Sequence, residues 1–213
     1  MLPPLLLGHR GARADKSIPE NTLPSFDLCL AHGCDGFEFD VRLSADGEAV
    51  IAHDARSRGR TISRTQARDL DLPTLRDVLQ RFASRAFLDI ELKVAGLEQK
   101  VAGLLHDFPL QRSYVVSSFL PAVLHALHAA APEVPLGLIC EKKGQLAALD
   151  GLPASFVMLE ESLASEGNLT RFGPARVMVW TVNRESRMRR YLERGVAGII
   201  SDKTATLGNL RAR

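Results

Sequence analysis

The sequence has few of the residues that mark specialised classes of protein. Its 213 residues include 3 cysteines and 1 tryptophan, and aromatic residues make up 6%. The cysteine count is odd and no CxxC pair occurs, which argues against a disulfide framework, a redox motif or a zinc site. Cys29, Cys34 and Cys140 each lie among apolar residues, so we expect buried thiols and a reducing compartment.

Long apolar runs and a large net charge are also missing. No run approaches the roughly 20 residues that span a bilayer. The opening MLPPLLLGHRG has neither the basic region nor the cleavage site of a signal peptide. The 27 Lys and Arg residues nearly balance 25 Asp and Glu residues, and the net charge of +2 is too small to predict nucleic acid or anionic membrane as a partner. We expect a cytoplasmic protein that acts on a small molecule, and the oligomeric state stays open.

Short β-rich runs alternate with helical patterns along the chain, which is typical of a parallel sheet in an α/β protein. We predict eight main strands, with a short extended piece at Ala49–His53: Leu5–His9, Gly36–Leu43, Phe87–Lys93, Tyr114–Phe119, Leu136–Cys140, Phe156–Glu160, Val177–Val182 and Gly198–Ser201. Helices are predicted at Leu23–Ala31, Thr74–Ala83, Leu97–Asp107, Pro121–Ala131, Gly144–Leu149 and Arg184–Arg194, with a last one within Thr204–Arg213. The segment Ser162–Pro174 is a poor helix candidate.

This alternation favours a single-domain (β/α)8 TIM barrel over residues 1–213, with short rim loops. A doubly wound open sheet is the alternative, since periodicity does not reveal closure. The first predicted strand is not followed by a glycine-rich dinucleotide fingerprint, which argues against a Rossmann site.

Polar residues stand at the predicted strand ends, where a barrel places its active site. Side chains alternate along a strand, so Glu38 shares one face with Asp40, and Glu91 shares one with Asp89 and Lys93. His9 and Arg10 end the first strand, and His53 ends the short piece. Salt bridges alone could explain each group, but together they would need several separate buried polar networks.

These groups suit metal-assisted chemistry on an anionic substrate. Carboxylate oxygens favour Mg²⁺, Ca²⁺ or Mn²⁺, and zinc is disfavoured without cysteine ligands or an HExxH pattern. Arg10 and Lys93 would attract a phosphate, and two histidines could divide the proton transfers. The residues alone therefore predict metal-dependent cleavage of a phosphate ester or diester.

The motifs resemble the glycerophosphodiester phosphodiesterase family. The matching pieces keep the family's order and span most of the chain: GHRGA (8–12), PENTLPSF (19–26), GFEFDVRLSADGEAVIAHD (36–54), LPTLRDVL (72–79), LDIELK (88–93), SSF (117–119) and VWTVN (179–183). The resemblance implies a (β/α)8 barrel that uses a divalent cation to hydrolyse glycerophosphodiesters to an alcohol and glycerol 3-phosphate.

The resemblance also implies roles for individual residues. His9 and His53 would be the catalytic acid/base pair, in an order that the sequence does not assign. Glu38, Asp40 and Glu91 fit the metal positions, and Glu20 would bind the metal or lie beside its ligands. Arg10 and Lys93 would hold the phosphate, while Phe119 and Trp180 would wall the glycerol or leaving-group side. Asn21 would tie down its loop.

The sequence departs from the usual pattern in two places. The segment from Gly11 to Pro19 is slightly longer, and the loop from His53 to the PTL motif is shorter. The short loop predicts an open pocket, which keeps a lysolipid-cleaving or cyclising phosphodiesterase as an alternative. A barrel that only binds phosphorylated ligands is disfavoured because each expected catalytic position is filled.

Overall fold

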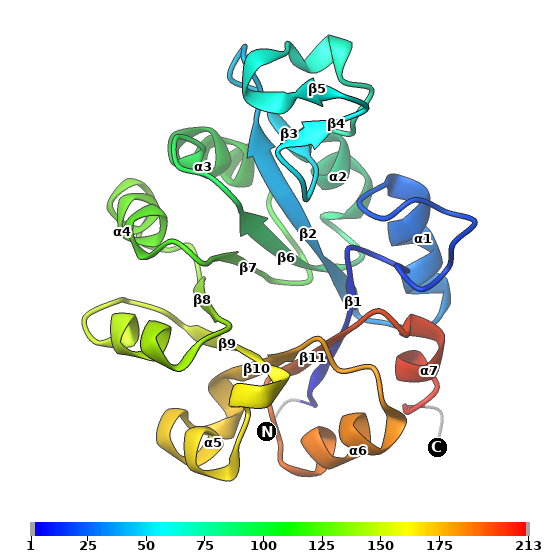
Figure 1. Ribbon diagram of the computed structural model, residues 1–213, viewed down its shortest axis with the longest axis vertical. Coiled ribbons are helices and arrows are strands. Elements are labelled where there is room, and N and C mark those ends of the chain that lie inside the picture. The colour runs from blue at the N-terminus through cyan, green and yellow to red at the C-terminus, as the bar shows by residue number, and fades with distance from the viewer. Residues whose placement is uncertain (1–2, 212–213) are drawn as a thin grey trace.

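Eight parallel strands close into a barrel in the computed structural model, which describes residues 3–211. The barrel strands are β1 (Leu5–His9), β2 (Gly36–Leu43), β6 (Phe87–Leu92), β7 (Tyr114–Ser118), β8 (Leu136–Cys140), β9 (Phe156–Glu160), β10 (Val177–Trp180) and β11 (Gly198–Ser201). β1 pairs with β2 on one side and with β11 on the other, so the sheet has no free edge within this ring. Figure 1 shows the helices outside the ring. The (β/α)8 prediction is confirmed, and the open sheet is excluded.

Helices and 3₁₀ turns connect the strands around the outside. The helices are α1 (Leu23–Ala31), α2 (Leu75–Phe82), α3 (Glu98–Asp107), α4 (Pro121–Ala130), α5 (Glu166–Phe172), α6 (Glu185–Glu193) and α7 (Thr204–Gly208). The 3₁₀ turns are Ile62–Arg64, Ala67–Asp69, Lys143–Leu149, Glu161–Leu163 and Pro174–Arg176. None of the described helices is long and apolar enough to cross a membrane.

Two predictions about the helices differ from the structure. α5 lies within the segment 162–174 that the sequence pattern left without a helix. The side chain of Ser165 accepts a hydrogen bond from the Asn168 backbone amide and so starts the helix. Leu169 is its one buried residue, so the helix presents almost no apolar periodicity. The predicted helix at 144–149 is a 3₁₀ turn, Lys143–Leu149.

Alternating side chains divide the core into an inner and an outer layer. Seven strands each contribute one residue to a cluster inside the ring: Leu7, Phe87, Val115, Ile139, Met158, Met178 and Ile200. The remaining strand, β2, turns Phe37, Phe39 and Val41 into the outer layer between sheet and helices. Its other face carries Glu38 and Asp40, which are nonetheless buried. Together with Asp89 and Glu91 of β6, these residues bring charge into the barrel interior.

The segment after β3 (Ala49–Ile51) leaves the barrel as a small projection. β4 (Arg56–Ser57) and β5 (Arg60–Thr61) form an antiparallel hairpin within it. Ile62 and Leu70 close it against Val50 and Ala52 in an apolar cluster of their own. In Figure 1 this projection stands beyond the strand ends of β2 and β3. The hairpin could not be predicted from the sequence pattern, because strands of two residues carry no periodicity.

Candidate active site

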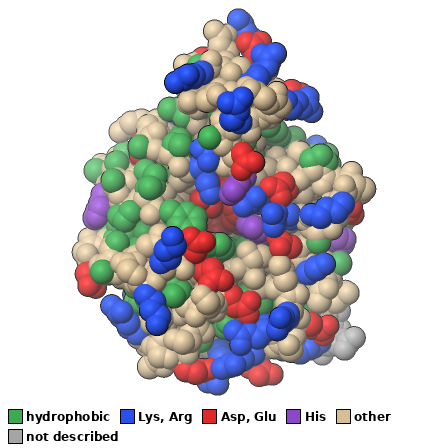
Figure 2. Space-filling view, in the orientation of Figure 1, with side chains coloured by type: hydrophobic (Ala, Val, Ile, Leu, Met, Phe, Trp, Pro, Cys, Tyr) green, Lys and Arg blue, Asp and Glu red, His purple; other side chains and the backbone are tan. Residues whose placement is uncertain are grey.

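A cavity of about 260 Å³ opens among the carboxyl ends of the strands. Eight of the ten predicted site residues line it: His9, Arg10, Glu38, His53, Glu91, Lys93, Phe119 and Trp180. Asp40 lies directly behind it in contact with Arg10 and Lys93, and Glu20 lies beside Arg10. Figure 2 shows acidic, basic and histidine side chains gathered around the hollow at the centre of this face.

Three carboxylates converge at this cavity. Glu38, Asp40 and Glu91 each offer an oxygen, and these oxygens lie within 4.8 Å of one another. Adjacent strands bring them together, because Asp40 of β2 is in register with Glu91 of β6. All three residues are buried. Carboxylates so close repel one another, so this arrangement is stable only with cations nearby.

Burial and mutual repulsion dominate the electrostatics of the cluster. Burial and the neighbouring Asp40 and Glu91 raise the pKa of Glu38 well above its ordinary value. Burial and Asp40 also raise the pKa of Glu91, although the Lys93 ammonium opposes the shift. The pKa of Lys93 is itself raised, because the attraction of Glu91 and Asp40 outweighs the effect of its burial. The raised pKa values of Glu38 and Glu91 show that these acids lack enough positive charge around them.

Two protein cations meet part of this need. Arg10 Nε lies 3.2 Å from Asp40 Oδ2, and Lys93 Nζ lies 2.6 Å from Glu91 Oε1 and 3.2 Å from Asp40 Oδ1. Asn21 donates from Nδ2 to Asp40 Oδ2 at 2.8 Å. Asn21 was expected only to tie down its own loop, and its amide also holds a carboxylate of the cluster.

The cluster still has unused acceptor atoms. Among residues 3–211, no hydrogen-bond donor is found for the buried Glu38 Oε1. The buried Asp40 Oδ1 and Glu91 Oε1 meet a single group, the Lys93 ammonium, at 3.2 Å and 2.6 Å. A divalent cation fits such a site, because Mg²⁺, Ca²⁺ and Mn²⁺ all take carboxylate oxygens as ligands.

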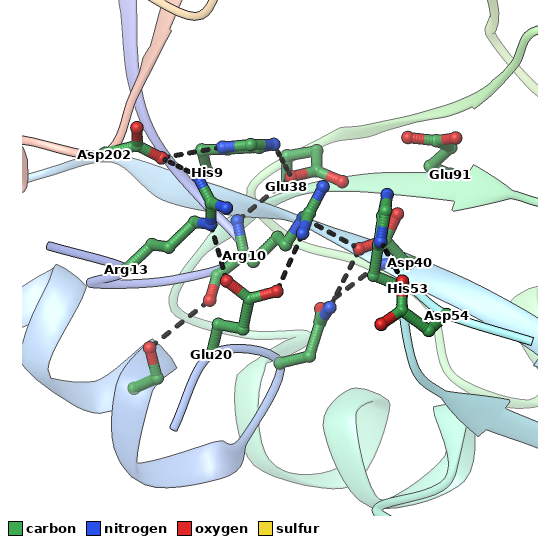
Figure 3. Close-up of polar contacts among 12 residues, drawn as sticks. His9, Arg10, Arg13, Glu20, Glu38, Asp40, His53, Asp54, Glu91 and Asp202 are labelled. Atoms are coloured by element: carbon green, nitrogen blue, oxygen red, sulfur yellow. Dashed lines mark hydrogen bonds and ion pairs between the residues drawn. The ribbon is translucent and has the colours of Figure 1, made fainter. Parts of the chain in front are cut away.

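Glu20 differs from the other predicted metal residues. It is outside the group of three converging carboxylates. Its oxygens accept hydrogen bonds from Arg10 Nη1 at 2.7 Å and from Arg13 Nε at 2.5 Å. These two arginines outweigh its partial burial and lower the pKa of Glu20. In this arrangement Glu20 orients Arg10, as Figure 3 shows.

His9 is held by a residue that the sequence analysis did not single out. Its Nδ1 lies 2.8 Å from Asp202 Oδ1, and its Nε2 lies 3.9 Å from Glu38 Oε2. Asp202 directly follows β11 and also accepts a hydrogen bond from Asn183 Nδ2 at 2.7 Å. Partial burial would raise the pKa of Asp202, but the bonds from His9 and Asn183 hold it well below its ordinary value. Figure 3 shows His9 between Asp202 and Glu38.

Arg13 connects the His9–Asp202 pair to Glu20 and, through it, to Arg10. Its Nη1 donates to Asp202 Oδ1 at 3.2 Å while its Nε bonds Glu20. A continuous chain of ion pairs therefore runs from Arg10 through Glu20 and Arg13 to Asp202. The strand-end rule that found His9 would also have found Asp202 after the eighth strand. Arg13 lies in a loop and carries no comparable signal.

His53 has a similar but more exposed partner. Its Nδ1 lies 2.8 Å from Asp54 Oδ1, and the exposed fractions of the two side chains are 38% and 81%. Arg42 Nε donates to the His53 carbonyl oxygen at 2.8 Å, which fixes the backbone of this residue against β2. His9 and His53 line the same cavity. The structure therefore brings the two predicted proton-transfer groups together.

The apolar side of the cavity is formed by two aromatic rings and the barrel interior. Phe119 and Trp180 meet edge to face, with centroids 5.7 Å apart and an interplanar angle of 86°. Ile139, Met158 and Ile200 lie below them. Two acidic residues of the lining were outside the predicted set. Asp89 accepts a hydrogen bond from Ser117 Oγ at 2.6 Å, and Glu141 follows β8.

Comparison with known proteins gives one consistent result. A family model described as "Glycerophosphoryl diester phosphodiesterase family" matches residues 9–102 and 91–206. A glycerophosphodiester phosphodiesterase of Caldanaerobacter subterraneus is 28% identical over 246 residues, covering 97% of each chain. One from Bacillus altitudinis is 25% identical and covers 92% of this chain and 94% of its own.

Solved structures share the fold. A phosphodiesterase of Oleispira antarctica, solved in complex with the product sn-glycerol-3-phosphate, superimposes with a TM-score of 0.85. It is 24% identical, and the match covers 99% of this chain and 98% of the other. At this identity the likeness establishes the barrel architecture.

Proposed function

Since the chain belongs to the glycerophosphoryl diester phosphodiesterase family, we propose that it hydrolyses glycerophosphodiesters to an alcohol and glycerol 3-phosphate. The observation that carries the proposal is the buried triad Glu38, Asp40 and Glu91 in a cavity that also holds two histidines and two cations. The product bound to the Oleispira antarctica phosphodiesterase is the one that this reaction releases. A binding protein would not need paired histidines beside an acidic cluster.

Glu38, Asp40 and Glu91 would hold the divalent cation. Their unused buried oxygens support this role. When bound, the cation supplies positive charge that polarises the phosphate and stabilises negative charge developing on it. Mg²⁺, Ca²⁺ and Mn²⁺ all suit this donor set. Glu20 contributes indirectly by orienting Arg10.

Arg10 and Lys93 would bind and orient the phosphate. Both line the cavity and both contact the acidic cluster, so they lie beside any anion held there. Positioning cations around a phosphoryl group is the main protein contribution to such reactions. Arg10 also gives its backbone amide to Glu38 Oε2 at 3.0 Å, which couples the clamp to the cluster.

His9 and His53 would divide the proton transfers. One accepts a proton from the attacking hydroxyl, of water or of the substrate's own glycerol, and the other donates a proton to the departing alkoxide. Asp202 holds His9 through Nδ1, which leaves Nε2 as the atom available toward the cavity. Asp54 does the same for His53. The order of the two roles stays open.

A lysolipid substrate is the second candidate, because five apolar residues line the cavity. Three of them, Ile139, Met158 and Ile200, are buried inside the barrel. Leu120, 41% exposed, is the single large exposed hydrophobic residue among those the structure describes. A membrane-facing apolar surface is thus small, and the structure favours water-soluble diesters.

The test is release of glycerol 3-phosphate from a panel of glycerophosphodiesters and lysophospholipids, in EDTA and then with Mg²⁺, Ca²⁺ or Mn²⁺. We expect metal-dependent release that falls by at least about 100-fold in His9→Ala and in Glu38→Gln. His125→Ala and Glu133→Gln are matched controls, because both residues are exposed away from the cavity. Metal-independent release, or full activity in Glu38→Gln, would refute the assignment. Release of alcohol from lysolipids alone would favour the second candidate.

We also propose a cytoplasmic location. Cys29, Cys34 and Cys140 are buried free thiols, which suits a reducing compartment. Cell fractionation with an antibody against the chain would test this.

A further inference from the structure

Glu141 lines the cavity but is separate from the metal triad. It follows Cys140, the last residue of β8, and its side chain is largely exposed. Within residues 3–211, no lysine, arginine or histidine lies within 4 Å of its carboxylate, and no side-chain hydrogen bond reaches it. The other carboxylates of the lining are either in the triad or, like Asp89, hydrogen-bonded. Glu141 is therefore an unpartnered negative charge at the mouth of the site.

Two aromatic rings line the same cavity as this carboxylate. Phe119 follows β7, the strand on one side of β8, and Trp180 ends β10, two strands away on the other side. Cys140 is in register with Leu159, and Leu159 with Val179, so Glu141 and Trp180 occupy the same level of the barrel. Two strand spacings separate their backbones by about 10 Å, and both side chains line the cavity, so one small group there can meet both.

The ring of Trp180 is fixed in place. Its Nε1 donates to the Met158 carbonyl oxygen at 3.2 Å, and its edge-to-face contact with Phe119 restrains the other ring. The buried side chains of Ile139 and Met158 lie beneath and offer no hydrogen bonds. Such a surface suits a group with apolar substituents better than a polyol.

The protein's own cations in the cavity are already engaged elsewhere. Lys93 Nζ lies 5.6 Å from the centre of the Phe119 ring, but it also contacts Glu91 and Asp40. Arg10 contacts Glu20 and Asp40. Phosphate would draw both cations further toward the triad. The positive charge that Glu141 and the aromatic rings attract must therefore come from the substrate.

We propose that Glu141, Trp180 and Phe119 form a subsite for a cationic head group, so that the substrates are diesters of amino alcohols. This inference rests on the proposed function and names its substrate class. Quaternary ammonium groups bind against aromatic faces, and the carboxylate adds an attraction that salt screens. The phosphate end would face Arg10 and Lys93 while the ammonium end faces Glu141.

The first experiment measures selectivity between diesters. kcat/KM is determined for glycerophosphocholine and for the uncharged-head-group diester glycerophosphoglycerol, with saturating Mg²⁺. In Glu141→Gln we expect the choline-to-glycerol ratio of kcat/KM to fall about threefold to fivefold, mainly through a higher KM for glycerophosphocholine. Glu133→Gln is the matched control, since it removes the same charge near the opposite end of β8 and is exposed. Added NaCl should lower the choline-to-glycerol ratio of kcat/KM in the wild type but not in Glu141→Gln.

The second experiment is independent of turnover. Trp180 is the one tryptophan of the chain, so its fluorescence reports directly on the subsite. Choline chloride is titrated against NaCl at constant ionic strength, with glycerol as the neutral probe. We expect a saturable response to choline that weakens in Glu141→Gln and is unchanged in Glu133→Gln.

The two experiments separate this inference from the proposed reaction. Saturable choline binding that depends on Glu141, without hydrolysis of any diester, would support the subsite and refute the reaction. Hydrolysis with equal kcat/KM for both diesters, or a ratio unchanged in Glu141→Gln, would overturn the subsite and leave the reaction standing. A preference for glycerophosphoglycerol would also overturn it, because the rings would then bind a polyol.

Discussion

Replacing Asp202 by asparagine removes one negative charge and hardly changes the size of the side chain. The carboxylate accepts from His9 Nδ1 at 2.8 Å, and the exposed fractions of the two side chains are 14% and 17%. An asparagine amide can instead donate to Nδ1, which places the ring proton on Nε2, the nitrogen toward Glu38. His9 would then be unable to accept a proton at that atom.

The magnitude follows from the contact and its burial. A hydrogen bond to a charged partner contributes about 1.5–3 kcal/mol when water is largely excluded, which corresponds to about 10- to 150-fold in rate. The altered tautomer adds to this loss. We therefore expect kcat of Asp202→Asn to fall about 100-fold or more. KM should change little, because Asp202 does not directly contact Arg10, the proposed phosphate ligand.

The matched control is Asp54→Asn. Asp54 makes a contact of the same length to His53, but its side chain is 81% exposed, so water replaces much of the lost interaction. We expect kcat to fall less than about fivefold there. Arg13→Gln tests the other partner of Asp202 and should have an intermediate effect. Steady-state kinetics and circular dichroism on all three variants give the answer. Equal losses in the two aspartate variants, or near-normal kcat in Asp202→Asn, would refute the reasoning.

Three further predictions concern stability. Mg²⁺ or Ca²⁺ at 100 times Kd should raise the free energy of unfolding by about 2.7 kcal/mol, and Tm should rise accordingly. Glu38→Gln should abolish this rise in Tm, measured by differential scanning fluorimetry. In EDTA, Asp89→Asn should stabilise the protein at pH 8.5 by up to about 4 kcal/mol and much less at pH 5. The reason is that burial raises the pKa of Asp89 to about 7, so wild-type stability is lost as pH rises through that value; a pH-independent effect would contradict this. The lowered pKa of Asp202 predicts the opposite sign: the Tm advantage of wild type over Asp202→Asn should be present above about pH 4 and disappear at lower pH, as the folded carboxylate is protonated.

The sequence predicted the barrel because its strands are strongly patterned. Seven strands each place one residue in the interior cluster, and their other face packs on the helices. Most of them read as nearly continuous apolar runs, whereas β6 (FLDIEL) alternates apolar and acidic residues. The elements that it missed are short or weakly apolar. α5 depends on the Ser165 cap, and the hairpin of β4 and β5 depends on side chains packing under the projection.

The site was predictable to the extent that its residues follow strands. His9, Glu38, Glu91 and Lys93 all stand in or directly after a strand, and strand-end position alone brings them to one face. Asp202 obeys the same rule and could have been included. The pairing of Arg13 with both Glu20 and Asp202 spans 189 residues of sequence and depends on loop conformation. No local pattern encodes such a contact.

β2 carries both the buried carboxylates of the candidate site and the aromatic packing that keeps them in place. Phe37 stacks on Phe26 of α1 and meets Phe82 of α2 edge to face, while Phe39 lies tilted against Phe26. All four rings are fully buried. Burying them contributes about 6–12 kcal/mol, which offsets the several kcal/mol that each buried carboxylate costs. A one-residue slip would exchange the two faces, putting the rings in the cavity and the carboxylates against the helices. The aromatic packing therefore fixes the register that brings Glu38 and Asp40 to Glu91.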